Sequence, residues 1–278
     1  MRTHTERLVA RDGYFSPESM VRRLGNSPVI PFLGGGAAVL LQVAHPLVGI
    51  GVVEHSGYDR DLWRRLVRTL RALYLIAFGD KAEAERAGAA VRAVHARVHG
   101  NTGEQLGPFP PGTAYSASDP ELMVWVHATL VHSSLAAYER FVHSLSMDER
   151  DLYVREMSVV ARLFGTPADV LPAGYGEFLA YFEAEVSSGA ITVTAPAREV
   201  ASVILATPLP APLRLLAPAH RLATARILPP ALRREYGLRW TGLDELALPI
   251  AGRVVRYGSI PALSVAARLR PPDDALAA

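Results

Sequence analysis

The sequence predicts an all-α protein, and three observations support this fold class. Long segments with apolar residues at every third or fourth position follow one another along the chain. Segments with the alternating pattern of a β-strand are scarce. The chain has 278 residues, of which 50% are hydrophobic, so it can bury a large core without disulfides or a structural metal. We therefore expect one helical domain over residues 27–268, an N-terminal extension over 1–26 and a loose C-terminal tail over 269–278.

The first apolar segment, residues 29–53, is long enough to cross a bilayer. Gln42, His45 and Pro46 interrupt it, and a polar side chain in lipid is costly. A Gly-Gly-Gly triplet also breaks the run and leaves 37–53 as the continuous helix. We expect a buried core helix; the alternatives are a membrane contact through 37–53 and a cleaved export signal. No pattern typical of an export signal closes the segment, so we expect a cytoplasmic protein.

The remaining helices have recognisable start and stop signals. Asp80 is a typical N-cap residue, Asp119-Pro120 combines a cap with proline at the first helical position, and Ser146 and Glu149 have the spacing of a capping box. The predicted helices are 59–78, 80–99, 120–142, 147–164, 175–186, 197–205, 213–227 and 242–257, and residues 191–194 are predicted to be extended.

The composition excludes several classes of function. The chain has no cysteine, so disulfide frameworks, thiolate metal sites, iron–sulfur clusters and cysteine nucleophiles are excluded. Lys+Arg total 29 and Asp+Glu total 27, a net charge of +2, which argues against a protein that neutralises nucleic-acid phosphates.

Histidine is therefore the ligand to examine, and most of the nine histidines lie in one half of the chain. His95 and His99 are four residues apart, so on a continuous helix they would share a face and could meet one cofactor or ion. The competing interpretation for any single histidine is a core imidazole hydrogen-bonded to a backbone carbonyl. Glu54, between Val53 and His55, is the best candidate for a buried acid.

Four short stretches together resemble a known family. They are LLQVAHPLVGIGVVEHS at 40–56, RLVRT at 65–69, RAVHARVHG at 92–100 and WVHATL at 125–130. In this order they resemble the latex-clearing proteins and rubber-oxygenase-like (MpaB-type) oxygenases, and the resemblance extends roughly over 27–246. It implies an α-helical protein with a globin-like core and, in the latex-clearing branch, a b-type haem.

The resemblance also implies roles for particular residues. The haem ligand of the branch lies in an Arg-x-x-His-x-x-x-Arg helix, which matches Arg92 and His95, with His99 at the trailing arginine position. An upstream Arg-x-x-Lys-Thr matches Arg65, Arg68 and Thr69. The family glutamate proposed as a base lies upstream of that motif, in the region of Glu54.

Arg68 stands where the branch has a lysine that can close the distal side of the iron. A guanidinium stays protonated and cannot coordinate iron. The sixth iron position is therefore either open to dioxygen or filled by another group, such as His127 or His45.

We therefore expect a haem-b-dependent oxygenase that acts on an apolar small molecule with dioxygen. His95 holds the iron, and Arg65, Arg68 and Arg92 neutralise the haem propionates or orient dioxygen. Thr69 donates a hydrogen bond near the distal face, and His127 and His99 line the pocket. The alternatives are a haem-binding, sensing or redox protein with two histidine ligands, and a non-haem metal held by the histidines.

Overall fold

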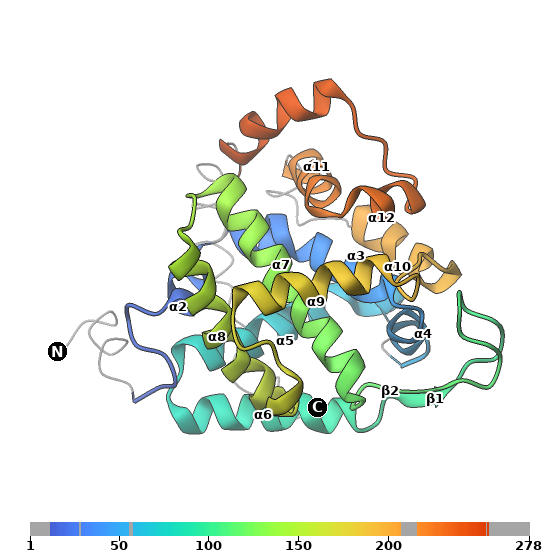
Figure 1. The fold of residues 1–278 in the computed structure, drawn as a ribbon, viewed down its shortest axis with the longest axis horizontal. Coiled ribbons are helices and arrows are strands. Elements are labelled where there is room, and N and C mark those ends of the chain that lie inside the picture. The colour runs from blue at the N-terminus through green and yellow to red at the C-terminus, as the bar shows by residue number, and fades with distance from the viewer. Residues whose placement is uncertain (1–11, 28, 56–57, 207–215, 254, 256–278) are drawn as a thin grey trace.

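The computed structural model describes residues 12–27, 29–55, 58–206, 216–253 and 255, without the side chains of 58–66. Within these residues the chain is almost entirely helical, and the regular strands form one two-stranded sheet, so the predicted all-α class is confirmed (Figure 1). The helices in chain order are α2 (Met20–Gly25), α3 (Gly35–Ala44), α4 (Pro46–His55), α5 (Tyr58–Phe78), α6 (Lys81–His95), α7 (Pro120–Phe141), α8 (Met147–Phe164), α9 (Tyr175–Ser187), α10 (Ala195–Ala206), α11 (Ala217–Ile227) and α12 (Pro230–Glu235). A π-helical turn, η1 (Ile30–Gly34), precedes α3, a 3-10 turn, η2 (Ala168–Val170), follows α8, and residues 242–253 are also helical.

The core is built around α3, which packs against α4, α7, α10 and α11. Leu40 and Leu41 of α3 are fully buried, and the indole nitrogen of Trp125 on α7 donates to the Leu41 carbonyl at 3.2 Å. The Trp125 ring stacks on Phe182 of α9, with 5.7 Å between the ring centroids. In Figure 1, α5 and α6 lie along the bottom of this core, and α11, α12 and helix 242–253 lie at the top.

The predicted start signals are confirmed where the structure describes them. Asp80 caps α6 in a capping box with Glu83, Ser146 caps α8 in the same way, and Asp119 accepts from the Glu121 amide at the start of α7. Such caps satisfy amides that have no partner within the helix. Glycine ends α8 as well, because Gly165 adopts the left-handed conformation (φ 104°) that favours this residue.

Residues 20–25 lie in the segment that we expected to be an extension, yet they form α2 and belong to the core. The helix packs against α5 and α8 and buries Met20, Val21 and Leu24.

The prediction of one continuous helix over 37–53 is wrong. The chain bends by 105° between η1–α3 and α4, at His45 and Pro46. Proline has no amide hydrogen to donate and disfavours helical geometry at the residue before it, and His45 is extended (φ −76°, ψ 116°). No single helix in the described ranges is long and apolar enough to cross a bilayer. The two helices of the bent pair are long and apolar enough only when they are taken together.

The prediction of a helix over 80–99 is also wrong at its end, because α6 stops at His95. The next residues turn, and His99 begins strand β1 (His99–Asn101), which pairs antiparallel with β2 (Ala114–Ser116). The Val98 carbonyl accepts from the Ala117 amide at 2.9 Å, so the segment after His95 is held by the hairpin instead of continuing the helix. His95 and His99 therefore share no helix face, and the side chain of His99 is exposed.

The segment 191–194, predicted to be extended, forms no strand. It is held instead by the Ala44 carbonyl, which accepts from the Thr192 amide at 2.9 Å, and by Glu235, which accepts from the Val193 amide at 2.8 Å.

Candidate functional site

His95 lies on the inward stripe of α6. Ala84 and Gly88 are buried, and His95 follows them at the helical spacing of the same face. The side chain is half-buried, and its Nδ1 atom is fully buried. The sequence thus places an imidazole at the inner surface of a helix that packs against α5 and α8.

Helix α5 packs against α6, and only Gly79 and Asp80 separate the two helices in the chain. Arg68 and Thr69 lie on α5 and are exposed among the described residues. Arg65 lies on the same helix, but its side chain is outside the described part of the structure.

Glu54, His55 and Tyr115 form a hydrogen-bonded cluster at the end of α4, which we call the α4 cluster. Tyr115 is buried in β2 and its hydroxyl donates to Glu54 Oε2. Because this hydroxyl carries one proton, its oxygen accepts from His55 Nε2, at 3.0 Å. Burial and, next, the bond to Glu54 raise the pKa of Tyr115 above its usual value, so the phenol stays protonated and remains a donor.

Two glycines make room for Tyr115. Gly51 lies on the face of α4 that carries Glu54 and His55, and a Cβ there would touch the Tyr115 ring at 3.6 Å. Gly100 pairs with Tyr115 across the hairpin, and a Cβ there would lie 2.6 Å from the Tyr115 hydroxyl oxygen. Sequence reasoning missed Tyr115 because it missed the hairpin.

The α4 cluster and the end of α6 are neighbours. Val98, whose amide donates to the His95 carbonyl at 3.0 Å, packs beside Gly51, at 3.5 Å from a Cβ built there. The turn that follows α6 therefore packs against the helix that carries Glu54.

The imidazole of His127 on α7 is buried. It forms no hydrogen bond within the described residues. Burial alone lowers its pKa to about 4, so it is neutral near pH 7. It lies four residues after Met123, whose Cε is 3.7 Å from a Cβ built on Gly165, and the Arg92 side chain flanks the same glycine. His127 lies about 200° around α7 from Trp125, which stacks toward α9. His127 therefore lies on the side of α7 away from α9, the side on which Met123 lies near the end of α8.

Other buried histidines have protein partners. His45 accepts from the Leu47 amide through Nδ1 at 3.2 Å and so caps the first turn of α4, and burial lowers its pKa to about 4. His132 donates to the Ile227 carbonyl at 3.2 Å and stacks on Phe182, and His220 donates to the Phe32 carbonyl at 2.7 Å. These contacts are those of core imidazoles.

Arg92 has a structural contact. Its guanidinium donates to the Leu163 carbonyl in the last turn of α8, where the helix dipole favours a cation. The arginine expected at a propionate is thus held at the end of a neighbouring helix.

The described histidines are compatible with a haem, which takes few ligands from the protein. Among the described residues, no three His, Asp or Glu side chains come together as a metal site. Haem iron needs only one or two imidazoles from the protein, and His95 and the unbonded, neutral His127 supply that chemistry.

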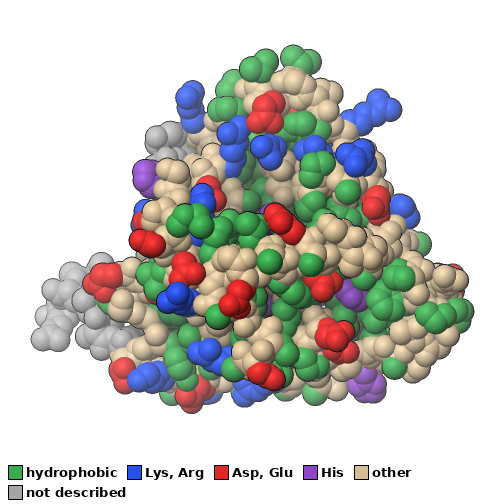
Figure 2. Space-filling view, in the orientation of Figure 1, with side chains coloured by type: hydrophobic (Ala, Val, Ile, Leu, Met, Phe, Trp, Pro, Cys, Tyr) green, Lys and Arg blue, Asp and Glu red, His purple; other side chains and the backbone are tan. Residues whose placement is uncertain are grey.

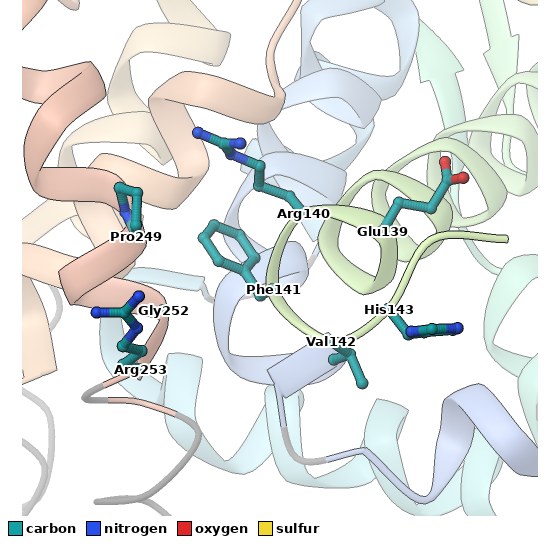
Figure 3. Close-up of a pocket in the computed structure, with 8 residues that line it drawn as sticks. All are labelled: Glu139, Arg140, Phe141, Val142, His143, Pro249, Gly252 and Arg253. Atoms are coloured by element: carbon teal, nitrogen blue, oxygen red, sulfur yellow. The ribbon is translucent and has the colours of Figure 1, made fainter.

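A cavity of about 350 Å³ lies elsewhere, between the end of α7 and helix 242–253 (Figure 3). None of the candidate residues lines it. Its lining residues are Glu139, Arg140, Phe141, Val142, His143, Pro249, Gly252 and Arg253.

The described chain is thus an all-α domain that carries a neutral buried imidazole on α7, a half-buried imidazole at the end of α6 and a carboxylate bonded to Tyr115 at the end of α4. The family model described as ER-bound oxygenase mpaB/B'/Rubber oxygenase, catalytic domain, matches residues 22–257. The chain therefore belongs to this family, and it is an oxidoreductase of the oxygenase class. No curated protein and no solved structure matches the chain, so the likeness of its core to globins stays a prediction.

Proposed function

We propose that the protein is a haem-b-dependent oxygenase that acts on an apolar small molecule and that His95 holds the iron. The observation that carries this proposal is the position of His95, half-buried on the inward stripe of α6 with its Nδ1 atom fully buried. Family membership supports the reaction class, and the absence of cysteine excludes a thiolate ligand, which favours one of the nine histidines.

When bound, haem would supply the redox centre at which dioxygen is activated. The chain's own residues would supply charge, proton acceptors and exclusion of water. Glu54 is the proton acceptor in this proposal, and the hydroxyl of Tyr115 orients its carboxylate. Arg65, Arg68 and Thr69 would act from α5, where Arg68 remains a cation that cannot bind the iron.

The test is an absorption spectrum of the purified protein reconstituted with haem. We expect a Soret band that His95→Ala abolishes. His99→Ala is the matched control, since His99 is exposed and lies beyond the end of α6, and it should leave the band unchanged. A wild-type protein without a Soret band, or a His95→Ala variant with the wild-type spectrum, would contradict the proposal.

A second candidate, a haem protein with two histidine ligands and a sensing or redox role, is favoured by His127. This imidazole is buried and neutral and has no hydrogen bond within the described residues. A six-coordinate ferrous spectrum that His127→Ala converts to a five-coordinate one would favour this role. A wild-type ferrous protein that is five-coordinate and binds carbon monoxide would favour the oxygenase.

A further inference from the structure

Helix 242–253 is apolar on two opposite faces. Its inner face buries Leu248 completely and packs Gly252 against Phe141 of α7. Its outer face carries Leu243, Leu246 and Ile250, which are 78%, 73% and 61% exposed and are the most exposed aliphatic residues described. These three side chains, which we call the outer stripe, follow the helical spacing i, i+3 and i+7. A helix that is apolar all round normally has both faces covered.

The acidic side chains in this part of the chain have partners within the protein, whereas several of the arginines have no ion pair among the described residues. The acidic side chains of this region are engaged within the protein: Asp244 accepts from Thr241 in a helix cap, and Glu245 pairs with Arg140 at 3.0 Å and Arg226 at 3.4 Å. Glu235 accepts from the Val193 amide.

Three exposed arginines of this end of the chain have no ion pair within the described residues: Arg234 on α12, Arg239 just before the helix, and Arg253, which also lines the cavity of Figure 3. Arg253 continues the line of the outer stripe, three residues after Ile250. Figure 2 shows hydrophobic side chains at the top of the molecule with an acidic side chain among them, and Lys and Arg side chains below and to both sides.

We infer that the outer stripe is a docking surface for an anionic lipid bilayer. Interfacial helices insert an apolar face below the headgroups and keep arginines at the level of the lipid phosphates. Trp240, one residue before the helix cap, packs against the protein with the Arg233 guanidinium over its ring at 5.1 Å, so it fixes the start of this helix and is no part of the stripe.

Two arguments disfavour a second copy of the chain as the partner that covers the outer stripe: the charge of the nearby arginines and the small area of the stripe. A two-fold contact through the outer stripe would bring Arg253 and Arg239 of both copies toward each other, and like charges repel. Three side chains also provide far less than the roughly 800 Å² per partner that a stable interface buries. This inference does not depend on haem, and its test uses no activity.

The test is flotation of the full-length protein with vesicles. We expect binding to vesicles of phosphatidylcholine and phosphatidylglycerol in equal parts, weaker binding to phosphatidylcholine alone, and release by salt. Replacing Leu243, Leu246 and Ile250 together by Ser should lower the affinity about tenfold or more, because the apolar insertion is lost. Arg239→Gln with Arg253→Gln should reduce binding to the anionic vesicles only.

The matched control is Met147→Ser with Leu152→Ser on α8, which removes exposed apolar side chains (60% and 45% exposed) from another surface. It should bind as the wild type does. Circular dichroism verifies the fold of each variant. The inference is overturned if the wild type fails to float, if the stripe variant floats like the wild type, or if the stripe instead mediates a dimer seen by light scattering.

Discussion

The position of Tyr115 shows how single residues define the candidate site. Its ring fills space that Gly51 and Gly100 leave open, and its hydroxyl links a carboxylate to an imidazole. The expectation that Glu54 is a buried acid is wrong, because its side chain is 44% exposed at the end of α4, and without this bond its carboxylate would sample many orientations in water. The buried phenol restricts it to one of them.

The corresponding prediction is that Tyr115→Phe preserves the fold and impairs the reaction. The ring packing remains, so we expect a loss of about 1 kcal/mol in the free energy of unfolding, measured with urea. Turnover by the reconstituted enzyme should fall about tenfold if Glu54 is the proton acceptor. Tyr14→Phe is the control, since Tyr14 also donates to a glutamate, Glu85, but at the exposed surface. Equal losses of turnover in the two variants would argue against a role for the α4 cluster.

At the scale of whole elements, local signals predicted helix starts well and two boundaries poorly. The caps at Asp80, Asp119 and Ser146 act within one turn, so the sequence contains them in full. The end of α6 depends on pairing with residues 114–117, which no local pattern around His95 encodes. The bend before α4 had a local signal in Pro46, although its angle depends on how α3 and α4 pack.

The bend leads to a prediction for Gly49, which faces the end of α3. A Cβ on Gly49 would lie 2.8 Å from the Val43 carbonyl oxygen, a backbone atom that can move only with α3. Gly49→Ala should therefore reduce the free energy of unfolding by about 1–3 kcal/mol in urea titrations. The control is Gly176→Ala in α9, where a Cβ meets no atom within 4 Å and alanine favours the helix. A Gly49→Ala protein as stable as the control would mean that the bend can open at little cost.

At the scale of the molecule, the apolar periodicity was enough for the fold class, because it reports which helix faces are buried. The periodicity could not predict which of the histidines belong to the candidate site. The chain has several buried histidines, and only the tertiary contacts separate His132 and His220, which bond to carbonyls, from His127, which bonds to no described residue. Sequence spacing grouped His95 with His99, whereas the fold ends α6 at His95 and places His99 in β1.

This burial of imidazoles predicts that the protein without cofactor is sensitive to acid. Burial lowers the pKa values of His45 and His127 to about 4, and it also lowers those of His132 and His220. In the unfolded chain a histidine titrates near 6.5, so between pH 6.5 and 4 the unfolded state binds more protons. Stability from these groups is thus complete above pH 6.5 and is lost as the pH falls toward 4.

For His45 and His127 we expect a loss of about 2 kcal/mol each between pH 7 and pH 5. Urea titrations at the two pH values measure it, and His127→Phe should remove the contribution of one histidine because phenylalanine binds no proton. His143→Phe is the control, since His143 is exposed and should leave the pH dependence unchanged. A stability that is the same at pH 5 and pH 7 would mean that these imidazoles reach water in the folded protein, and His127 would then be a poor candidate for a buried ligand.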